Sequence, residues 1–302
     1  MDLQDRTEGL VEGLHAIAGD GAWSPDERHL AATYLSKDGF TAVLVDVDTL
    51  AWWRLGPAQG SMHPVWHPSG QRLLLNGFCG APGPERACVH LTDVPGGESA
   101  FLAFGSTFFC VDPYWQGRWL LSRRAEKQRW QDLPRYRFYL VDEAGESEEV
   151  LADRVVRSII VSPGGERAAA ICLPPGATRE SLPNGPYRLS VLEGPHGVPP
   201  REIAQGDYWW LRWSNAADRL LTSNTDYGSG EAPPIFVIDP GSGTEAPVQL
   251  ADGSPLTGIE PVWAGDDSCI LYIRPSAVGG TEIWSYGFAR KRGKRLYPFE
   301  DD

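Results

Sequence analysis

Six side chains that could do chemistry stand at one recurrent position of the sequence, three residues before a tryptophan or before the residue that replaces it. They are Asp20, His63, Asp112, Ser158, Trp210 and Glu260. If they converge, they form a polar and mostly anionic pocket, which suits Ca²⁺, Mg²⁺ or Mn²⁺ and equally suits an amine or guanidinium group. The cation would be held by Asp20, Asp112 and Glu260. Clustered carboxylates raise one another's pKa, so His63 and a neighbouring acid could serve in general acid/base catalysis.

The same ring of six residues also has a purely structural interpretation. Its members would then cap the ends of strands and bind water, and a one-residue slip in register would turn each side chain to the other face. Trp210 follows Trp209 directly, and neighbours in a strand point to opposite faces. One of the two is therefore expected to pack, and the other could be a stacking platform for a sugar, an aromatic group or a peptide.

Two basic segments contrast with the acidic chain. Residues 122–137 carry six basic and two acidic side chains, among which Arg123, Arg124 and Arg129 could clamp a carboxylate or a phosphate. The alternative is a solvated loop, or a loop that pairs with the acidic body of the protein. Residues 290–295 form a second basic run, whose simplest interpretation is an exposed turn between the third and fourth strands of a repeat unit.

The spacing of the remaining residues excludes other catalytic and metal-binding motifs. His63 and His67 are four residues apart, which in a strand separates them by about 13 Å, too far to share a metal. The sequence contains no Cys-x-x-Cys, no phosphate-binding Gly-x-x-x-x-Gly-Lys and no dinucleotide fingerprint. No nucleophile and base can therefore be paired from the sequence.

The elements that must position the ring follow from an internal repeat. A tryptophan or valine followed by a short turn recurs at residues 23, 66, 115, 161, 213 and 263. Each interval holds an apolar run, a second run that closes on an acidic residue, as in 43–46, and a third short run, as in 51–55. Counting the run that ends on the tryptophan, each unit has four short strands. Six such units predict an all-β fold, a six-bladed β-propeller of four-stranded antiparallel blades.

The turn after the tryptophan carries a family resemblance. In Trp23-Ser-Pro-Asp26 the turn and the hydrophobic strand that follows it resemble the PD40 repeat, a WD40-like repeat of TolB-like six-bladed propellers that is also seen in prolyl-oligopeptidase-type enzymes and oligogalacturonate lyases. The resemblance covers residues from about 16 to 298 and implies a fold, not an activity. The chain is too short for the N-terminal domain of a TolB and has no Gly-x-Ser-x-Gly nucleophile elbow. The resemblance thus implies a stand-alone propeller.

Within this fold each tryptophan would end an innermost strand and fill the gap between neighbouring blades. The Asp or Ser after the proline would tie the turn by a side-chain bond to a backbone N–H. Residues 1–14 are expected to form an N-terminal arm or a closing strand, and residues 15–302 a single propeller domain. The long loops, at about 78–86, 123–136, 173–186 and 224–234, would share the face that carries the ring, and loops on a rigid frame commonly carry function.

Composition narrows the partners and the compartment. Lys+Arg of 27 against Asp+Glu of 40 gives a net charge of −13, which repels phosphate backbones and anionic lipid and argues against nucleic-acid and membrane binding. No apolar stretch resembles a signal peptide or a membrane span, so a cytoplasmic location is expected. The 5 scattered cysteines are expected to be reduced.

Three functions are consistent with these observations. The preferred one is a cytoplasmic propeller that binds a small molecule or a peptide at the loop-rich channel mouth, through the ring together with Arg123 and Arg124. The alternative is an enzyme of lyase, hydrolase or cyclase type that uses His63, Asp112 and Glu260, with or without a divalent cation. The third is a protein-interaction scaffold that uses blade edges and exposed tryptophans, such as those at 52 and 53 on an outermost strand.

Overall fold

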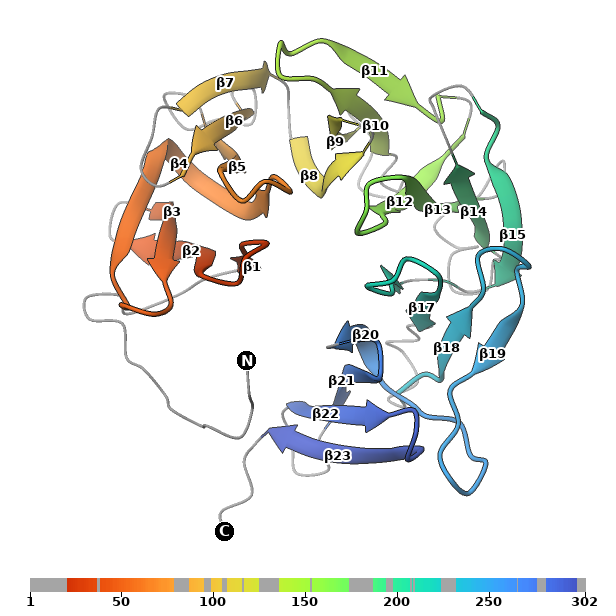
Figure 1. Cartoon of the computed structure of the whole chain (residues 1–302). Helices are drawn as coiled ribbons and strands as arrows, with labels where there is room; N and C mark the ends of the chain where they lie inside the picture. Colours follow the sequence, from red (N-terminus) through yellow and green to blue (C-terminus); the bar gives the residue numbers. More distant parts are fainter. Residues whose placement is uncertain are drawn as a thin grey trace. The chain divides into compact units, whose positions relative to one another are not determined.

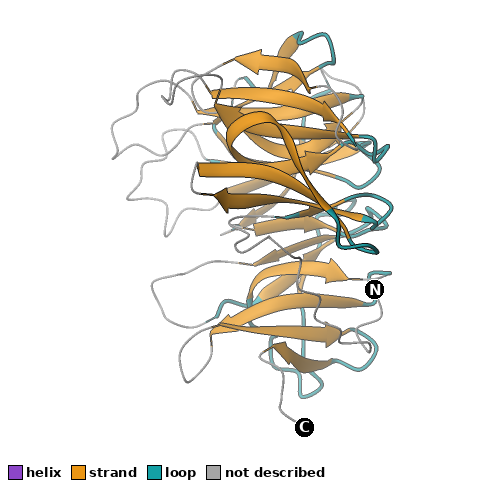
Figure 2. Cartoon of the chain, turned by 90° about the vertical axis from the view of Figure 1, so that its left-hand side faces the viewer, coloured by secondary structure: helices purple, strands orange, loops and turns teal. Residues whose placement is uncertain are grey.

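A computed structural model of the chain describes residues 21–36, 39–78, 87–94, 99–104, 108–115, 117–124, 136–152, 154–173, 187–193, 198–206, 208, 210–223, 232–264, 266–275 and 281–297. These ranges contain strands and turns but no helix (Figure 2). Consequently, no helical membrane span is found in them.

The strands follow one another in six groups of four, the blades of a six-bladed β-propeller (Figure 1). Neighbouring strands in each blade pair antiparallel. By contact clustering the chain divides into two compact units: residues 1–124 with 138–149, and residues 125–137 with 150–302. The first unit holds blades 1 to 3 and the second holds blades 4 to 6, apart from a few residues at the boundary.

In the first unit one strand serves two blades. Blade 1 is β1 (Ala22–Trp23), β2 (His29–Ser36), β3 (Gly39–Asp46) and the first half of β4 (Trp52–Trp66). Blade 2 is the second half of β4 with β5 (Arg72–Phe78), β6 (Ala87–Asp93) and β7 (Ser99–Phe104). Blade 3 is β8 (Phe108–Trp115), β9 (Arg118–Arg124), β10 (Tyr136–Val141) and β11 (Ser147–Val150).

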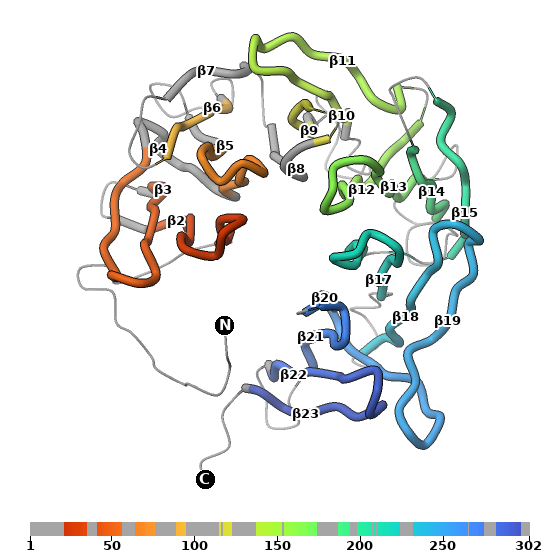
Figure 3. Tube along the Cα trace, in the orientation of Figure 1, coloured from red at the N-terminus to blue at the C-terminus, as the bar shows by residue number. Residues whose placement is uncertain are grey.

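In the second unit the three blades also follow in chain order, as the Cα trace in Figure 3 shows. Blade 4 is β12 (Val156–Val161), β13 (Arg167–Cys172), β14 (Tyr187–Glu193) and β15 (Arg201–Gly206). Blade 5 is β16 (Trp210–Trp213), β17 (Leu220–Ser223), β18 (Ile235–Ile238) and β19 (Glu245–Pro247). Blade 6 is β20 (Ile259–Ala264), β21 (Cys269–Pro275), β22 (Thr281–Gly287) and β23 (Arg292–Tyr297).

The hydrophobic core lies between neighbouring blades. The second strands are buried on both faces, so β17 reads Leu-Leu-Thr-Ser without a single exposed side chain. Between blades 4 and 5, Ile171 and Leu189 pack with Leu211, Trp213 and Ile238. A comparable cluster lies between blades 1 and 2, another between blades 2 and 3, and another between blades 5 and 6. Each blade therefore needs its neighbours to bury its faces.

The recurrent tryptophans fill these interfaces, as the repeat predicts. Trp66, Trp115, Trp213 and Trp263 are buried. The indole N–H of Trp66 donates to the carbonyl of Ala22 in the preceding blade at 2.8 Å, and that of Trp213 donates to Ile160 at 3.2 Å. Trp23 differs, because it is 48% exposed and belongs to the first strand of its unit, where no blade precedes it.

The turns after the tryptophans share one geometry. The hydroxyl of Ser24 accepts the N–H of His29 at 2.9 Å, and the hydroxyl of Ser214 accepts that of Arg219 at 3.0 Å. The residue four positions after the tryptophan, or after Val161 in blade 4, has positive φ in five blades, at Glu27, Gly70, Gly165, Ala217 and Asp267. The predicted tie is also present, since Asp26 accepts the N–H of Arg28 and Ser69 that of Gln71.

Candidate functional site

The inner strands that carry the predicted ring are irregular at the ring positions. The pairing of β12 shifts between Val156 and Ser158, and that of β20 shifts between Ile259 and Val262. In the first unit, β4 shifts between Met62 and Val65, and β8 shifts on both sides of Asp112. Bulges bend a strand and re-aim its side chains, and they are frequent next to active sites. Only β16, among the described inner strands with a ring residue, keeps a regular register there.

Glu260 has the least ordinary backbone of the ring residues in the second unit. Its φ is +50°, although it lies inside β20 and is followed by a proline. A non-glycine residue in this region is uncommon, and the conformation costs roughly 1–3 kcal/mol. The Glu260 side chain is half-buried. Such strain persists where the surrounding structure imposes it, and it clusters at ligand sites.

Trp210 is fixed beside Glu260. Its indole N–H donates to the carbonyl of Pro261, the next residue, at 3.2 Å. On the same strand, the guanidinium carbon of Arg212 lies 4.2 Å from the centre of the Trp210 ring, a cation–π contact. Arg212 also donates to the carbonyl of Leu211 at 3.0 Å. The half-buried indole is therefore held by two neighbours and preorganised.

Arg157 is a functional candidate that sequence reasoning did not find. It precedes Ser158 in β12, where the register shift places both residues in the irregular stretch. Its guanidinium donates to the hydroxyl of buried Tyr187 at 3.2 Å and lies 5.3 Å from the centre of that ring. The available signal was a single arginine in the apolar run Val155-Val-Arg-Ser-Ile-Ile160 of an inner strand.

The structure brings together two of the predicted residues and leaves others as predictions. Trp210 and Glu260 are joined through Pro261, whereas half-buried Ser158 lies on β12, which contacts the strand of Trp210. Asp20 and Arg129 lie outside the described residues. Of the remaining predicted residues the strand positions are described but the side chains are not: His63 in β4, Asp112 in β8, and Arg123 and Arg124 in β9. The predicted long loops lie mostly outside the described ranges.

The described side chains contain no complete metal-binding set. Among them, no group of three histidine, cysteine, aspartate or glutamate residues could hold a metal. Glu260 is the one predicted metal ligand whose side chain is described. On the other inner strands of the second unit, Arg157 of β12 and Arg212 of β16 carry guanidinium groups, which bind carboxylates with bidentate geometry.

Cys172 is a poor candidate for a nucleophile. Cys172 is buried and Cys269 is half-buried, and both are free thiols. Burial raises the pKa of the Cys172 thiol above its usual range, which disfavours the reactive thiolate. Trp53, on the outer strand of blade 1, is 38% exposed, while Trp52 packs with Tyr34 at a ring distance of 6.1 Å.

Comparisons with known proteins find similarity in fold but not in sequence. No protein-family model matches the chain, and no curated protein matches it. Among solved structures, a prolyl endopeptidase superposes with a TM-score of 0.68 at 13% identity, over 93% of this chain and 42% of that one. The chain therefore spans less than half of that enzyme.

Two further structures cover more of their own length. An oligogalacturonate lyase in complex with manganese superposes with a TM-score of 0.68 at 16% identity, over 90% of this chain and 78% of that one. TolB from Acinetobacter baumannii superposes with a TM-score of 0.55 at 11% identity, over 92% and 64%. Identities this low show a shared fold alone, and that fold is the β-propeller.

Proposed function

We propose that this protein binds a small molecule or a peptide at the mouth of its channel, and that the second unit contributes Trp210, Glu260, Arg157 and Arg212. The observation that carries the proposal is the strained backbone of Glu260 beside the fixed indole of Trp210. If this strand served only packing, a regular backbone without the positive φ of Glu260 would make the fold more stable, because the strain would be relieved.

The chemistry of these side chains describes the ligand. The carboxylate of Glu260 suits an amine or guanidinium group, and the guanidinium groups of Arg157 and Arg212 suit a carboxylate. The indole of Trp210 offers an apolar surface. A ligand with both charges and an apolar portion, such as a short peptide or an amino-acid derivative, satisfies all of these groups.

Thermal denaturation with a panel of compounds tests the proposal. The panel contains amino acids, dipeptides, tripeptides and oligogalacturonates. A ligand at 100 times its Kd adds about 2.7 kcal/mol, which raises Tm by several degrees. The shift should disappear in Glu260→Gln and in Trp210→Ala but persist in Glu202→Gln, a carboxylate change on outer strand β15. A panel without any shift, or a shift that survives Glu260→Gln, would show that this placement of the site is wrong.

The alternative function is an enzyme of lyase, hydrolase or cyclase type that uses His63, Asp112 and Glu260, with Ca²⁺, Mg²⁺ or Mn²⁺. It is favoured by the fold shared with the manganese-bound oligogalacturonate lyase. Here the test is the Tm of EDTA-treated protein with and without each ion at millimolar concentration. A selective rise that is lost in Asp112→Asn supports the alternative, and no rise with any ion counts against it.

A further inference from the structure

A cavity of about 240 Å³ opens between blades 5 and 6, away from the inner strands. Blade 5 lines it with Val237 of β18 and with Ala246 and Pro247 of β19. Blade 6 lines it with Tyr286 of β22 and with Phe288, which follows that strand. We refer to this cavity as the outer groove.

The blade 6 wall of the outer groove is aromatic and rigid. The ring of Phe288 stacks on Trp263 at 5.5 Å with an interplanar angle of 23°, and meets Tyr286 edge-on at 5.4 Å. The Tyr286 hydroxyl donates to the carbonyl of Gln249 at 2.6 Å. A wall that is already fixed loses little conformational entropy when a ligand binds to it.

The rim of the outer groove is positively charged. Arg219 and Lys291 both line the cavity, and no acidic residue is among the described residues that line it. Lys291 belongs to the basic hairpin, residues 290–295, in which Arg290, Lys291, Arg292 and Lys294 are exposed. The carbonyl of Lys291 accepts the N–H of Ala251 at 3.0 Å, which holds the hairpin against blade 5.

Nearby acidic groups are engaged in local contacts. Arg295, the last cation of the hairpin, pairs with Glu282 at 3.4 Å. Asp252, which follows Ala251, accepts the hydroxyl and the N–H of Ser254. Asp218 accepts from Ser214 and from the Arg219 side chain. The four exposed cations of the hairpin outnumber the exposed carboxylate of Asp252 and give this edge of an acidic chain a local positive field, which attracts acidic partners.

The volume of the groove fits a single anchoring side chain better than a cofactor-sized ligand. Pockets for cofactors and drug-sized ligands occupy roughly 300–1,000 Å³. The outer groove is smaller and matches a single aromatic side chain. Protein interfaces typically contain anchors of this kind, in which an aromatic side chain fills a small preformed pocket that has charged neighbours at its rim.

We propose that the outer groove and the basic hairpin form a docking surface for an acidic segment of a partner protein. The segment inserts one aromatic side chain between Phe288 and Pro247 and places its carboxylates near Lys291 and Arg292. The groove supplies the anchor, and the charges direct the approach and the register. This surface is independent of the proposed ligand site, since it shares no residue with it.

Selection from a random peptide library displayed on phage tests the proposal on the full chain. The expected winners combine one aromatic residue with several Asp or Glu residues. Selected peptides are then labelled and their affinity is measured by fluorescence anisotropy. Replacing the aromatic residue by Ser, or the acidic residues by Asn and Gln, should each weaken binding at least tenfold, and raising the salt concentration should weaken it progressively.

Variants of the protein locate the binding. Ala246→Trp fills the groove from an exposed position of β19 and should abolish binding, and Lys291→Glu with Arg292→Glu should weaken it at least tenfold. Arg28→Glu, a single charge reversal at an exposed turn of blade 1, should leave it unchanged. Circular dichroism and Tm establish that the variants are folded.

Three outcomes would overturn the docking surface. The first is selection of peptides without acidic residues. The second is binding that survives Ala246→Trp in a folded variant. The third is binding of heparin, a polyanion without aromatic groups, as tightly as the selected peptides, because the hairpin would then act without the groove. The same result would be expected if the cations served only to keep edge strand β23 from associating with other strands.

Discussion

The two interfaces of blade 5 use the same repeat and differ at their outer ends. Toward blade 4, Arg201 at the start of β15 donates to the carbonyls of Pro240 and Gly241 at 2.8 and 3.0 Å, and Gly243 packs directly on the carbonyl of Ile203. This end is closed. On this side too, the carboxylate of Glu245 at the start of β19 accepts the hydroxyl of Tyr208, which belongs to the cluster between blades 4 and 5. Toward blade 6, the small residues that follow Glu245 leave the outer groove.

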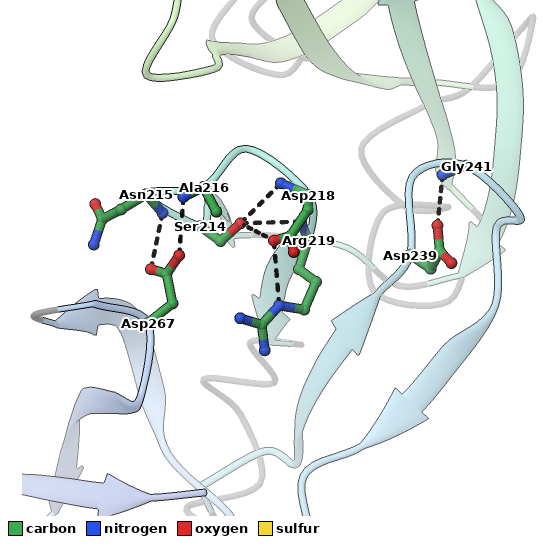
Figure 4. A network of polar contacts seen from close by, with 8 residues as sticks. All are labelled: Ser214, Asn215, Ala216, Asp218, Arg219, Asp239, Gly241 and Asp267. Atoms are coloured by element: carbon green, nitrogen blue, oxygen red, sulfur yellow. Dashed lines mark hydrogen bonds and ion pairs between the residues drawn. The ribbon is translucent and has the colours of Figure 1, made fainter.

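The inner ends of the two interfaces are both closed by hydrogen bonds, but different groups form them. Toward blade 4, the Trp213 indole donates to Ile160. Toward blade 6, the buried Trp263 indole N–H has no hydrogen-bond partner in the described part of the chain. Instead, the carboxylate of Asp267 accepts the N–H groups of Asn215 and Ala216 at 2.8 and 2.9 Å (Figure 4). The comparison teaches that the repeat fixes where blades meet, while single side chains decide which end of an interface is sealed.

The largest expected effect is at the closed outer end. In Gly243→Ala the added Cβ would clash with the carbonyl oxygen of Ile203, at a φ of +74°. Overpacking and left-handed strain together should destabilise the protein by about 3 kcal/mol. Gly253→Ala is the matched control, because its φ is +84° and nothing lies within 4 Å. For Gly253→Ala, urea unfolding should show a loss of about 1 kcal/mol in the free energy of unfolding. Equal losses in Gly243→Ala and Gly253→Ala would contradict the close approach of blades 4 and 5.

The second prediction concerns the hydrogen bonds of Asp267 at the inner end of the interface toward blade 6. Asp267→Asn keeps a residue that tolerates the φ of +65°, but replaces one acceptor oxygen by a donor that faces a buried N–H. The loss should be about 2 kcal/mol, the cost of one unsatisfied buried group. In contrast, Asp266→Asn, at an exposed neighbour, should change the unfolding free energy by less than about 0.5 kcal/mol. A loss in Asp267→Asn as small as in this control would mean that the carboxylate is not the seal.

The two indoles give a third prediction. Trp213→Phe removes volume and the hydrogen bond to Ile160, whereas Trp263→Phe removes similar volume and an N–H without a described partner. Trp213→Phe should therefore destabilise the protein by about 1 kcal/mol more than Trp263→Phe, which urea unfolding can resolve. The reverse order would indicate that the bond between the blades contributes nothing.

Much of this architecture could be predicted from the sequence. The repeat of tryptophans and turns predicts six blades, the Asp26 and Ser69 ties, and the hairpin at 290–295, because each depends on residues close together in the chain. The fold prediction is confirmed. The position of Trp210 in an inner strand was predictable for the same reason.

Features that depend on two blades could not be predicted. Arg201 binds Pro240 and Gly241 across some 40 residues, and no local pattern marks that contact. The outer groove exists because Ala246 and Pro247 are small opposite Phe288. The bulges in β12 and β20, which shift register by one residue, decide how Arg157 and Glu260 are presented, and sequence periodicity does not show where a strand bulges.

The smallest effect concerns the turn that Arg201 holds. The N–H groups of Ser242 and Gly241 bind the Asp239 carboxylate and keep its pKa below the ordinary value of 3.8. Because the pKa is lower in the folded state, this contribution to stability is complete above the ordinary pKa and is lost as pH falls through the folded-state pKa. Asp239→Asn should therefore reduce the fall of the urea midpoint between about pH 5 and pH 2.

A double-variant cycle tests whether Arg201 and the Asp239 turn contribute jointly to the stability of the interface toward blade 4. Arg201 donates hydrogen bonds to the turn that Asp239 also stabilises. The losses of unfolding free energy in Arg201→Ala and Asp239→Asn should therefore not add. Asp252 also has a lowered pKa, caused by the hydroxyl and then the N–H of Ser254, but its loop faces the basic hairpin and not Arg201. Asp252→Asn should consequently add to Arg201→Ala. If both carboxylates behave alike in the cycle, the outer end toward blade 4 is held by packing around Gly243, and the guanidinium contacts contribute nothing to its closure.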